Sequence, residues 1–81
     1  MKIIYFAWIR DITNFHEERI NSDEIKNLDH LKKYIISKYP DLKKHLDQEI
    51  LRFAVNQEYI IENIELNGDD EIAVFPPVSG G

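Results

Sequence analysis

The chain has 81 residues, of which 43% are hydrophobic, and its 15 acidic and 10 basic side chains give a formal net charge of −5 at pH 7. This length accommodates one domain with a modest core. Nucleic-acid-binding modules usually carry excess positive charge, so the acidic balance disfavours that class and favours a basic protein surface as partner. The sequence contains no cysteine, which excludes disulfides, thiolate metal sites and a cysteine nucleophile and fits a reducing, cytoplasmic location.

The N-terminal segment is predicted to form a hairpin. Residues 2–9 are rich in β-branched and aromatic side chains, which favour a strand, and the stretch is too short to span a bilayer. A polar turn is expected over residues 11–14, and residues 15–20 are expected to return as a second strand. We expect no targeting signal and no membrane association.

The spacing of apolar residues then becomes helical. Four of them recur at intervals of three and four and so share one helical face: Leu28, Leu31, Ile35 and Tyr39. Asn27 is expected to cap the N-terminus of this helix, and Pro40 to end it near Tyr39. A short further turn is expected over residues 41–46.

The C-terminal half is predicted to return to strands. Residues 50–55 and 58–61 are expected to pair across a two-residue turn at Asn56 and Gln57. An irregular acidic connection over residues 62–70 is then expected to lead into a final strand over residues 72–75.

This order of elements predicts a helix covering one face of a mixed sheet. The first and last strands are both strongly apolar, so we expect them side by side in the centre. The arrangement is that of a β-grasp, ubiquitin-like α+β fold, although the order alone leaves other small α+β topologies open. The domain would occupy residues 1–75, and residues 76–81 would form an extended tail.

Strand alternation predicts an apolar sheet face that the helix does not cover. With Lys2 facing solvent, Ile3, Tyr5, Ala7 and Ile9 would face the helix, and the outer face would carry Ile4, Phe6, Trp8, Ala54 and Phe75. An apolar cluster with a charged rim is typical of a surface that docks a protein. The alternative is that the connection over residues 62–70 folds over this face. We assign docking to Phe6, Trp8, Ala54, Tyr59 and Phe75, with Trp8 and Phe75 as anchors.

The last segment has an unusual composition, reading FPPVSGG over residues 75–81. Prolines fix φ and donate no backbone hydrogen bond, and glycines carry no side chain, so an extended arm able to enter a narrow channel is expected. Two terminal glycines alone are more typical of a disordered end. The strand and the two prolines before them favour a reactive terminus at Gly81.

These residues resemble the family of small, sulfur-carrying subunits of molybdopterin synthase. The resemblance covers essentially the whole chain and rests most strongly on GDDEIAVFPPVSGG at residues 68–81. It is also carried by AVNQEY at residues 54–59 and by Phe6-Ala7, Arg10-Asp11 and Lys38-Tyr39-Pro40. The chain departs from the pattern of this family at two positions, both outside the tail. Asp11 stands where glutamate is common, and Trp8 adds bulk in a variable stretch.

The resemblance implies a carrier whose Gly81 carboxylate becomes a thiocarboxylate. An adenylating, ubiquitin-activating-like enzyme would use ATP to activate Gly81, and a sulfur-donating protein would supply the sulfur. The tail would enter a channel of the large catalytic subunit through Pro76, Pro77, Val78, Ser79 and Gly80. There the sulfur would pass to cyclic pyranopterin monophosphate, within a heterotetramer whose catalytic residues belong to the large subunit. No bound cofactor is expected.

Other functional interpretations of the sequence remain open. The same carrier chemistry could serve thiamin synthesis or tRNA thiolation, and the same adenylate could join Gly81 to lysines in a ubiquitin-like modifier. A plain binding module with incidental glycines is a third class. His16, His30 and His45 lack the spacing of a metal site, so no metal is expected.

Overall fold

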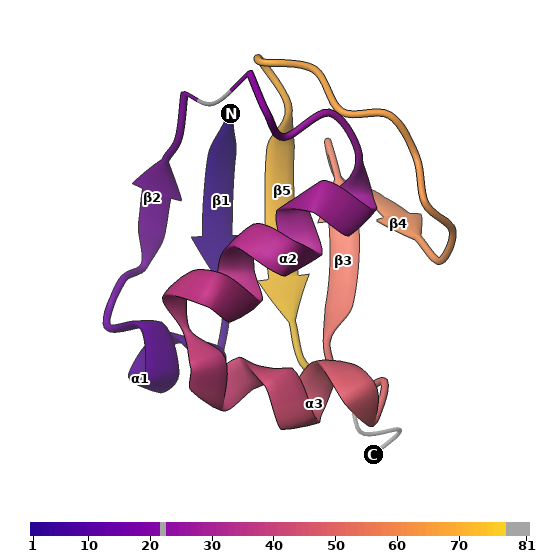
Figure 1. The fold of residues 1–81 in the computed structure, drawn as a ribbon. Coiled ribbons are helices and arrows are strands. Elements are labelled where there is room, and N and C mark those ends of the chain that lie inside the picture. The colour runs from indigo at the N-terminus through magenta and orange to yellow at the C-terminus, as the bar shows by residue number, and fades with distance from the viewer. Residues whose placement is uncertain (22, 78–81) are drawn as a thin grey trace.

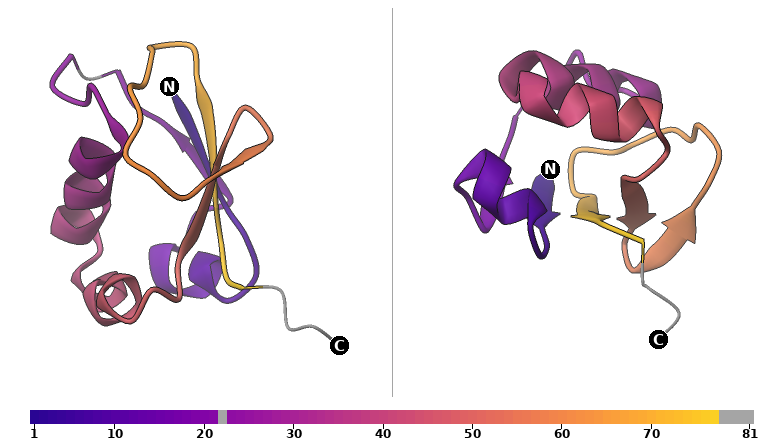
Figure 2. Two further views of the ribbon diagram at one scale, coloured as in Figure 1. Left: turned by 90° about the vertical axis from the view of Figure 1, so that its right-hand side faces the viewer. Right: turned by 90° about the horizontal axis from the view of Figure 1, so that it is seen from below.

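One mixed sheet of five strands, with helices against one of its faces, is formed by residues 1–21 and 23–77, the part of the chain described by this computed structural model (Figures 1 and 2). The strands are β1 (Lys2–Tyr5), β2 (Glu17–Arg19), β3 (Arg52–Val55), β4 (Glu58–Ile60) and β5 (Glu71–Phe75). The helices are α1 (Ile9–Thr13), α2 (Leu28–Lys38), the 3-10 turn η1 (Pro40–Leu42) and α3 (Lys43–Asp47).

The strand order β2-β1-β5-β3-β4 confirms the predicted β-grasp arrangement. β1 and β5 are neighbours and run parallel, in register from Lys2 opposite Glu71 to Tyr5 opposite Val74. On its other edge β5 pairs antiparallel with β3. The last strand is therefore the central one and is hydrogen-bonded along both edges.

The main helix α2 begins and ends where the sequence predicts. The Asn27 side-chain oxygen accepts a hydrogen bond from the His30 backbone N–H at 2.8 Å, which satisfies one of the free donors of the first turn. Pro40 opens η1 directly after the C-cap at Tyr39. The apolar side of α2 packs on the sheet, and the core between them contains Ile3, Tyr5, Leu28, Leu31, Ile35, Phe53, Ile72 and Val74.

The expected strand over residues 2–9 is wrong in its second half. β1 ends at Tyr5, and Ala7 has a φ of 54°, a left-handed conformation that turns the chain out of the sheet. Ala7 is exposed and does not face α2, whereas Ile9 reaches the core from the start of α1. A packed helical turn replaces the extended strand here, because it covers the end of the core.

The polar turn expected over residues 11–14 is also corrected. Its first three residues belong to α1, and Asn14 ends that helix with a φ of 65°. The strand expected over residues 15–20 shortens to β2, which still pairs antiparallel with β1. The strands expected at 50–55 and 58–61 likewise shorten to β3 and β4, and the further turn after α2 is confirmed as η1 and α3.

The connection between β4 and β5 lies on the helical side of the sheet (Figures 1 and 2). The Leu28 N–H donates to the Ile64 carbonyl and the Leu66 N–H to the Lys26 carbonyl, each at 2.9 Å. Leu66 is buried. The alternative that this connection covers the outer face is therefore wrong. None of the helices formed by residues 1–21 and 23–77 combines the length and the apolar character needed to cross a bilayer.

Candidate functional site

An apolar row crosses the sheet face opposite α2. The register places Ile4 of β1 beside Ala73 of β5, Ala73 beside Ala54 of β3, and Ala54 beside Tyr59 of β4. Ile4, Ala54 and Ala73 are half-buried and Tyr59 is exposed, whereas the residues that alternate with those of β1, β3 and β5 lie in the core. The predicted uncovered apolar face is therefore present, and Ala73 joins the row.

Aromatic side chains extend this row at the end of β5. The rings of Tyr59 and Phe75 meet edge to face, with centroids 6.1 Å apart. Phe6, which is 44% exposed, follows β1, and its N–H donates to the Val74 carbonyl at 3.0 Å. We call Ile4, Phe6, Ala54, Tyr59, Ala73 and Phe75 the outer-face cluster.

Trp8 does not lie on the outer face, contrary to the sequence-based expectation. Because the chain leaves the sheet after Tyr5, the Trp8 ring packs instead on the His45 ring of α3, with centroids 4.7 Å apart. Trp8 is 36% exposed at that position. Its assigned docking role therefore stays a prediction, and it concerns the end of the molecule near α3.

Charged side chains border the outer-face cluster at both ends. At one end the Lys2 ammonium lies 3.5 Å from a Glu17 carboxylate oxygen and 4.0 Å from one of Glu71. At the other end Arg52 stands opposite Phe75, and its guanidinium donates to the Glu49 carbonyl at 2.7 Å. An apolar centre with a charged rim is the usual anatomy of a protein-docking surface.

The tail starts from the central strand, beside the outer-face cluster. β5 is bonded to β1 and β3 up to its last residues, so the position of Pro76 is fixed by the sheet. Pro76 is half-buried and Pro77 is exposed. Val78, Ser79, Gly80 and Gly81 lie outside the described residues, so the channel-binding and reactive roles assigned to them stay predictions.

A polar cluster at the opposite end of β5 was missed by the sequence analysis. The Asn56 side-chain amide donates to an Asp70 carboxylate oxygen at 2.9 Å, and its oxygen accepts from the Glu71 N–H at 3.0 Å. The second Asp70 oxygen accepts from the Asn67 N–H at 2.7 Å. These contacts tie the β3–β4 turn to the start of β5. They give a structural role to Asn56 of the AVNQEY motif and to Asp70 of the GDDEIAVFPPVSGG motif. An asparagine in a tight turn, with an aspartate before a strand, was the available signal.

A second missed cluster surrounds Glu18 on the helical side of the sheet. Its carboxylate, whose side chain is 10% exposed, accepts hydrogen bonds from the hydroxyls of Tyr5 and Tyr39 and from the Lys38 ammonium. Burial raises the pKa of the Glu18 carboxyl, but the three hydrogen bonds together lower it more, so this pKa lies below its usual value. Burial and the bond to Glu18 raise the pKa of the Tyr5 hydroxyl. This cluster fastens the end of α2 to β1 and β2.

The three histidines lie in separate places. His16 contacts the Arg10 guanidinium at 3.0 Å, His30 accepts from the Lys26 N–H at 3.3 Å, and His45 packs on Trp8. Within residues 1–21 and 23–77, no three metal-ligating side chains gather into a group that could hold an ion.

Comparison with known proteins places this geometry in a family. A family model described as the ThiS family matches residues 3–81. The molybdopterin synthase sulfur carrier subunit of Homo sapiens is 41% identical over 85 residues, which cover 100% of this chain and 93% of that protein.

Two solved structures share the fold. A putative molybdopterin converting factor subunit 1 from Pyrococcus furiosus superposes with a TM-score of 0.83 at 29% identity, over 95% of each chain. A chain from the complex of subunits 1 and 2 of the molybdopterin-converting factor of Helicobacter pylori superposes with a TM-score of 0.66 at 23% identity, covering 99% of this chain and 96% of that one. On these matches, the chain described here belongs to the ThiS family.

Proposed function

We propose that this chain is the sulfur carrier subunit of a molybdopterin synthase and acts in molybdenum cofactor biosynthesis. The observation that carries the proposal is its similarity over the whole chain to proteins of that name, among them the human one at 41% identity. The FPPVSGG segment follows the central strand directly and has the composition that a reactive C-terminal arm requires. A cytoplasmic location belongs to the proposal and is supported by the absence of cysteine.

The chemistry would take place at the Gly81 carboxylate. A C-terminal carboxylate has a pKa of about 3.3–3.7, so at neutral pH it is an anion and a poor electrophile. An activating enzyme would join it to the α-phosphate of ATP with release of pyrophosphate. Hydrosulfide supplied by a donor protein would then attack the acyl carbon, and AMP would leave. The sulfur of the resulting thiocarboxylate would attack cyclic pyranopterin monophosphate, and water would then hydrolyse the acyl–sulfur bond, which leaves the sulfur on the pterin and returns Gly81 to the carboxylate.

The described residues would contribute docking and positioning. The outer-face cluster lies beside the start of the tail, so one partner surface could bind the cluster while the tail enters its active site. The name of the Helicobacter pylori relative, a complex of subunits 1 and 2, supports a large-subunit partner. We assign the catalytic residues to that subunit and expect a heterotetramer of two small and two large subunits.

Intact mass spectrometry of the protein isolated from its own host tests this function. We expect a fraction in which sulfur replaces one oxygen at Gly81. When that fraction is mixed with the purified large subunit and cyclic pyranopterin monophosphate, the sulfur should be consumed and molybdopterin should form. Protein joined to lysines through isopeptide bonds, with no thiocarboxylate form, would indicate a modifier. A thiocarboxylate that reacts only with a thiamin or tRNA thiolation system would indicate the other carriers.

A further inference from the structure

The two edges of the sheet differ in how they are protected. Exposed strand edges tend to pair with other chains, and proteins usually block them with charged side chains. β2 consists of charged residues alone, and its two glutamates form ion pairs with Lys2 and Lys38. The β4 edge carries Tyr59, which is 52% exposed, and continues into Ile61, which is 83% exposed. Of the three residues of β4 only Glu58 is charged, so the β4 edge is less protected than the β2 edge.

The hairpin geometry shows which backbone groups face this edge. Asn56 and Gln57 have φ values of 52° and 70°, as a two-residue type I′ turn requires, and Val55 and Glu58 are the pair that closes it. The closing pair exchanges hydrogen bonds with each other, and the bonding alternates along the ladder. The N–H and C=O of Tyr59 therefore point away from β3. By the same alternation, those of Ile61 do so as well.

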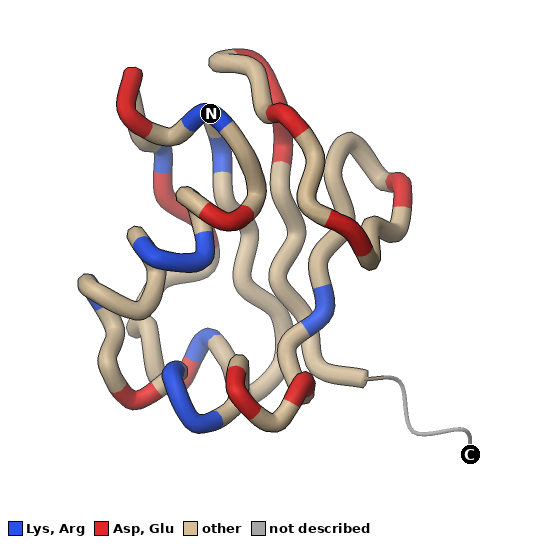
Figure 3. The backbone as a smooth tube through the Cα atoms, turned by 45° about the vertical axis from the view of Figure 1, so that its right-hand side comes forward, with Lys and Arg blue, Asp and Glu red and all other residues tan. Residues whose placement is uncertain are grey.

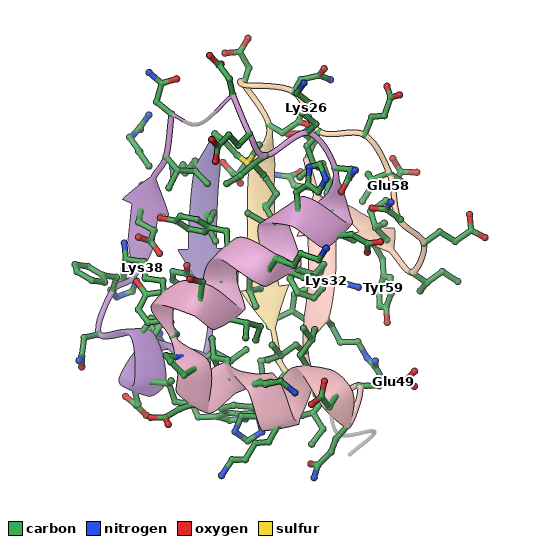
Figure 4. The ribbon with its side chains drawn as sticks, in the orientation of Figure 1. Lys26, Lys32, Lys38, Glu49, Glu58 and Tyr59 are labelled. Atoms are coloured by element: carbon green, nitrogen blue, oxygen red, sulfur yellow. The ribbon has the colours of Figure 1, made fainter. Side chains whose placement is uncertain are left out.

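A groove lies beside this edge, where β3 extends beyond the end of β4. Its volume is about 270 Å³, and Leu46, Leu51, Phe53 and Ile60 supply apolar lining. Lys32 and Arg52 also line it, with the Lys32 ammonium 5.3 Å from the centre of the Phe53 ring. Figure 4 shows Lys32, Glu49 and Tyr59 on this side of the molecule. The groove is large enough for an apolar side chain from a strand laid along the edge.

We propose that an extended segment of the large subunit pairs with the open edge of β4 and places an apolar side chain in this groove. The inference rests on the proposed function. Tyr59 belongs both to the edge and to the outer-face cluster, and its ring packs on Phe75 next to the start of the tail. A partner that receives the tail and covers the cluster would therefore lie against this edge.

The charges around the edge indicate the character of the segment. Glu49, Glu58 and Glu62 are exposed near it, and acidic positions are visible on this side of the chain in Figure 3. The Arg52 guanidinium is bonded to a backbone carbonyl and the Lys32 ammonium lies over an aromatic ring. We expect a lysine or arginine in the segment, next to its apolar residue. The formal net charge of −5 favours the same kind of partner.

A second copy of this chain is a poorer occupant of the edge. Antiparallel pairing of two β4 edges centred on Ile60 would set Glu58 of one copy opposite Glu62 of the other. Like charges opposite each other destabilise a strand pair. A basic segment of a different chain has no such conflict.

Hydrogen exchange in the complex tests the pairing without any substitution. The Tyr59 and Ile61 amides should exchange markedly more slowly when the purified large subunit is bound, whereas the amides of β2 should exchange at unchanged rates. Unchanged exchange at Tyr59 and Ile61 in a saturated complex would overturn the proposal. If these two amides exchange slowly in the carrier alone, and more slowly still at higher carrier concentration, the edge pairs with a second copy of this chain. That result would also overturn the proposal.

A proline substitution provides the second measurement. Ile61→Pro removes one outward N–H and leaves the bonds between β3 and β4 in place, and Ile61→Ala is the matched control that keeps the N–H. The proline variant should bind the large subunit roughly three- to tenfold more weakly than the alanine variant, as the loss of one backbone hydrogen bond predicts. Equal affinities, with melting temperatures equal to that of the parent, would contradict the pairing. Molybdopterin formation by the parent protein tests the proposed function separately. A failure of the strand-pairing proposal is therefore distinguishable from a failure of the proposed function.

Discussion

The hydroxyl of Tyr5 donates a hydrogen bond to the carboxylate of Glu18, which joins the interior of β1 to the edge strand β2. Tyr5 is fully buried, and the same carboxylate oxygen accepts from the Tyr39 hydroxyl at 2.9 Å. The other oxygen accepts from the Lys38 ammonium at the end of α2. One acidic side chain therefore connects three elements that are far apart in the sequence.

Replacing Glu18 by glutamine should destabilise the fold. Glu18→Gln keeps the shape of the side chain but loses the ion pair and an acceptor, so we expect the free energy of unfolding to fall by about 1–3 kcal/mol. Urea denaturation followed by circular dichroism measures this change. Glu17→Gln is the control, because that side chain is exposed and should change stability by no more than about 0.5 kcal/mol. Equal effects of the two substitutions would show that the cluster contributes nothing.

The same cluster predicts a dependence of stability on pH. The pKa of the Glu18 carboxyl is lowered in the folded state, so its stabilising effect is complete above the unfolded pKa of about 4.3 and is lost as the pH falls through the folded value. The melting temperatures of the parent and of Glu18→Gln should therefore differ at pH 7 and approach each other as the pH falls below the unfolded pKa. A difference that stays constant down to pH 2.5 would argue against an ionised Glu18 in the cluster.

Both the backbone conformation and the side chain of Asn56 should contribute to the stability of the fold. Asn56→Ala loses the hydrogen bonds to Asp70 and Glu71 and places alanine at a φ of 52°. We expect a loss of about 2–3 kcal/mol in the free energy of unfolding. Asn56→Gly restores the conformational freedom without the side chain, so its loss should be smaller. If both variants lose the same amount, the backbone conformation costs nothing at this position.

The aromatic pair at the start of the tail should dominate docking. Tyr59→Ala and Phe75→Ala should each weaken binding to the purified large subunit by about tenfold or more, because partly exposed aromatic side chains at the centre of an interface contribute most to affinity. The double variant should lose less than the sum of the two, since the rings are in contact. Phe15→Ala removes an aromatic ring that is 50% exposed on the other edge of the sheet and serves as the control. Equal losses from all three single variants would contradict docking at the outer-face cluster.

The terminal glycine should be essential for sulfur transfer and dispensable for folding. Gly81→Ala adds a Cβ next to the acyl carbon and should abolish thiocarboxylate formation, measured by mass spectrometry, while the melting temperature stays unchanged. Gly68→Ala makes the same chemical change where an added Cβ meets nothing within 4 Å. That control should retain both folding and transfer. Normal transfer by Gly81→Ala would refute the assignment.

Local patterns in the sequence were sufficient to predict α2 and the centre of the sheet. The apolar spacing from Leu28 to Tyr39 and the cap at Asn27 are signals contained within a few turns of helix. The pairing of the first and last strands was predictable from their apolar character, because strands in the middle of a sheet have neighbours on both edges and are the most buried. Much of the outer-face cluster was predictable as well, because alternation in a strand assigns side chains to faces, but the same rule placed Trp8 there wrongly.

The missed features depend on contacts between distant segments. Residues 6–9 look like a continuing strand, and alanine at residue 7 carries no signal for the positive φ that turns the chain there. Burying Ile9 at the end of the core requires that turn, but the requirement appears only once the fold is formed. Glu18 is a similar case, since a glutamate in a charged edge strand is normally solvated and its partner Tyr39 lies 21 residues away.

The central position of β5 has a consequence for turnover. Because β5 is hydrogen-bonded along both edges, replacing one carboxylate oxygen of Gly81 by sulfur should leave the outer-face cluster unchanged. A loaded carrier and a spent one would then present the same surface to a partner and compete for it. Release would require the whole molecule to dissociate, and the relative abundance of the two forms would set the pace of sulfur delivery.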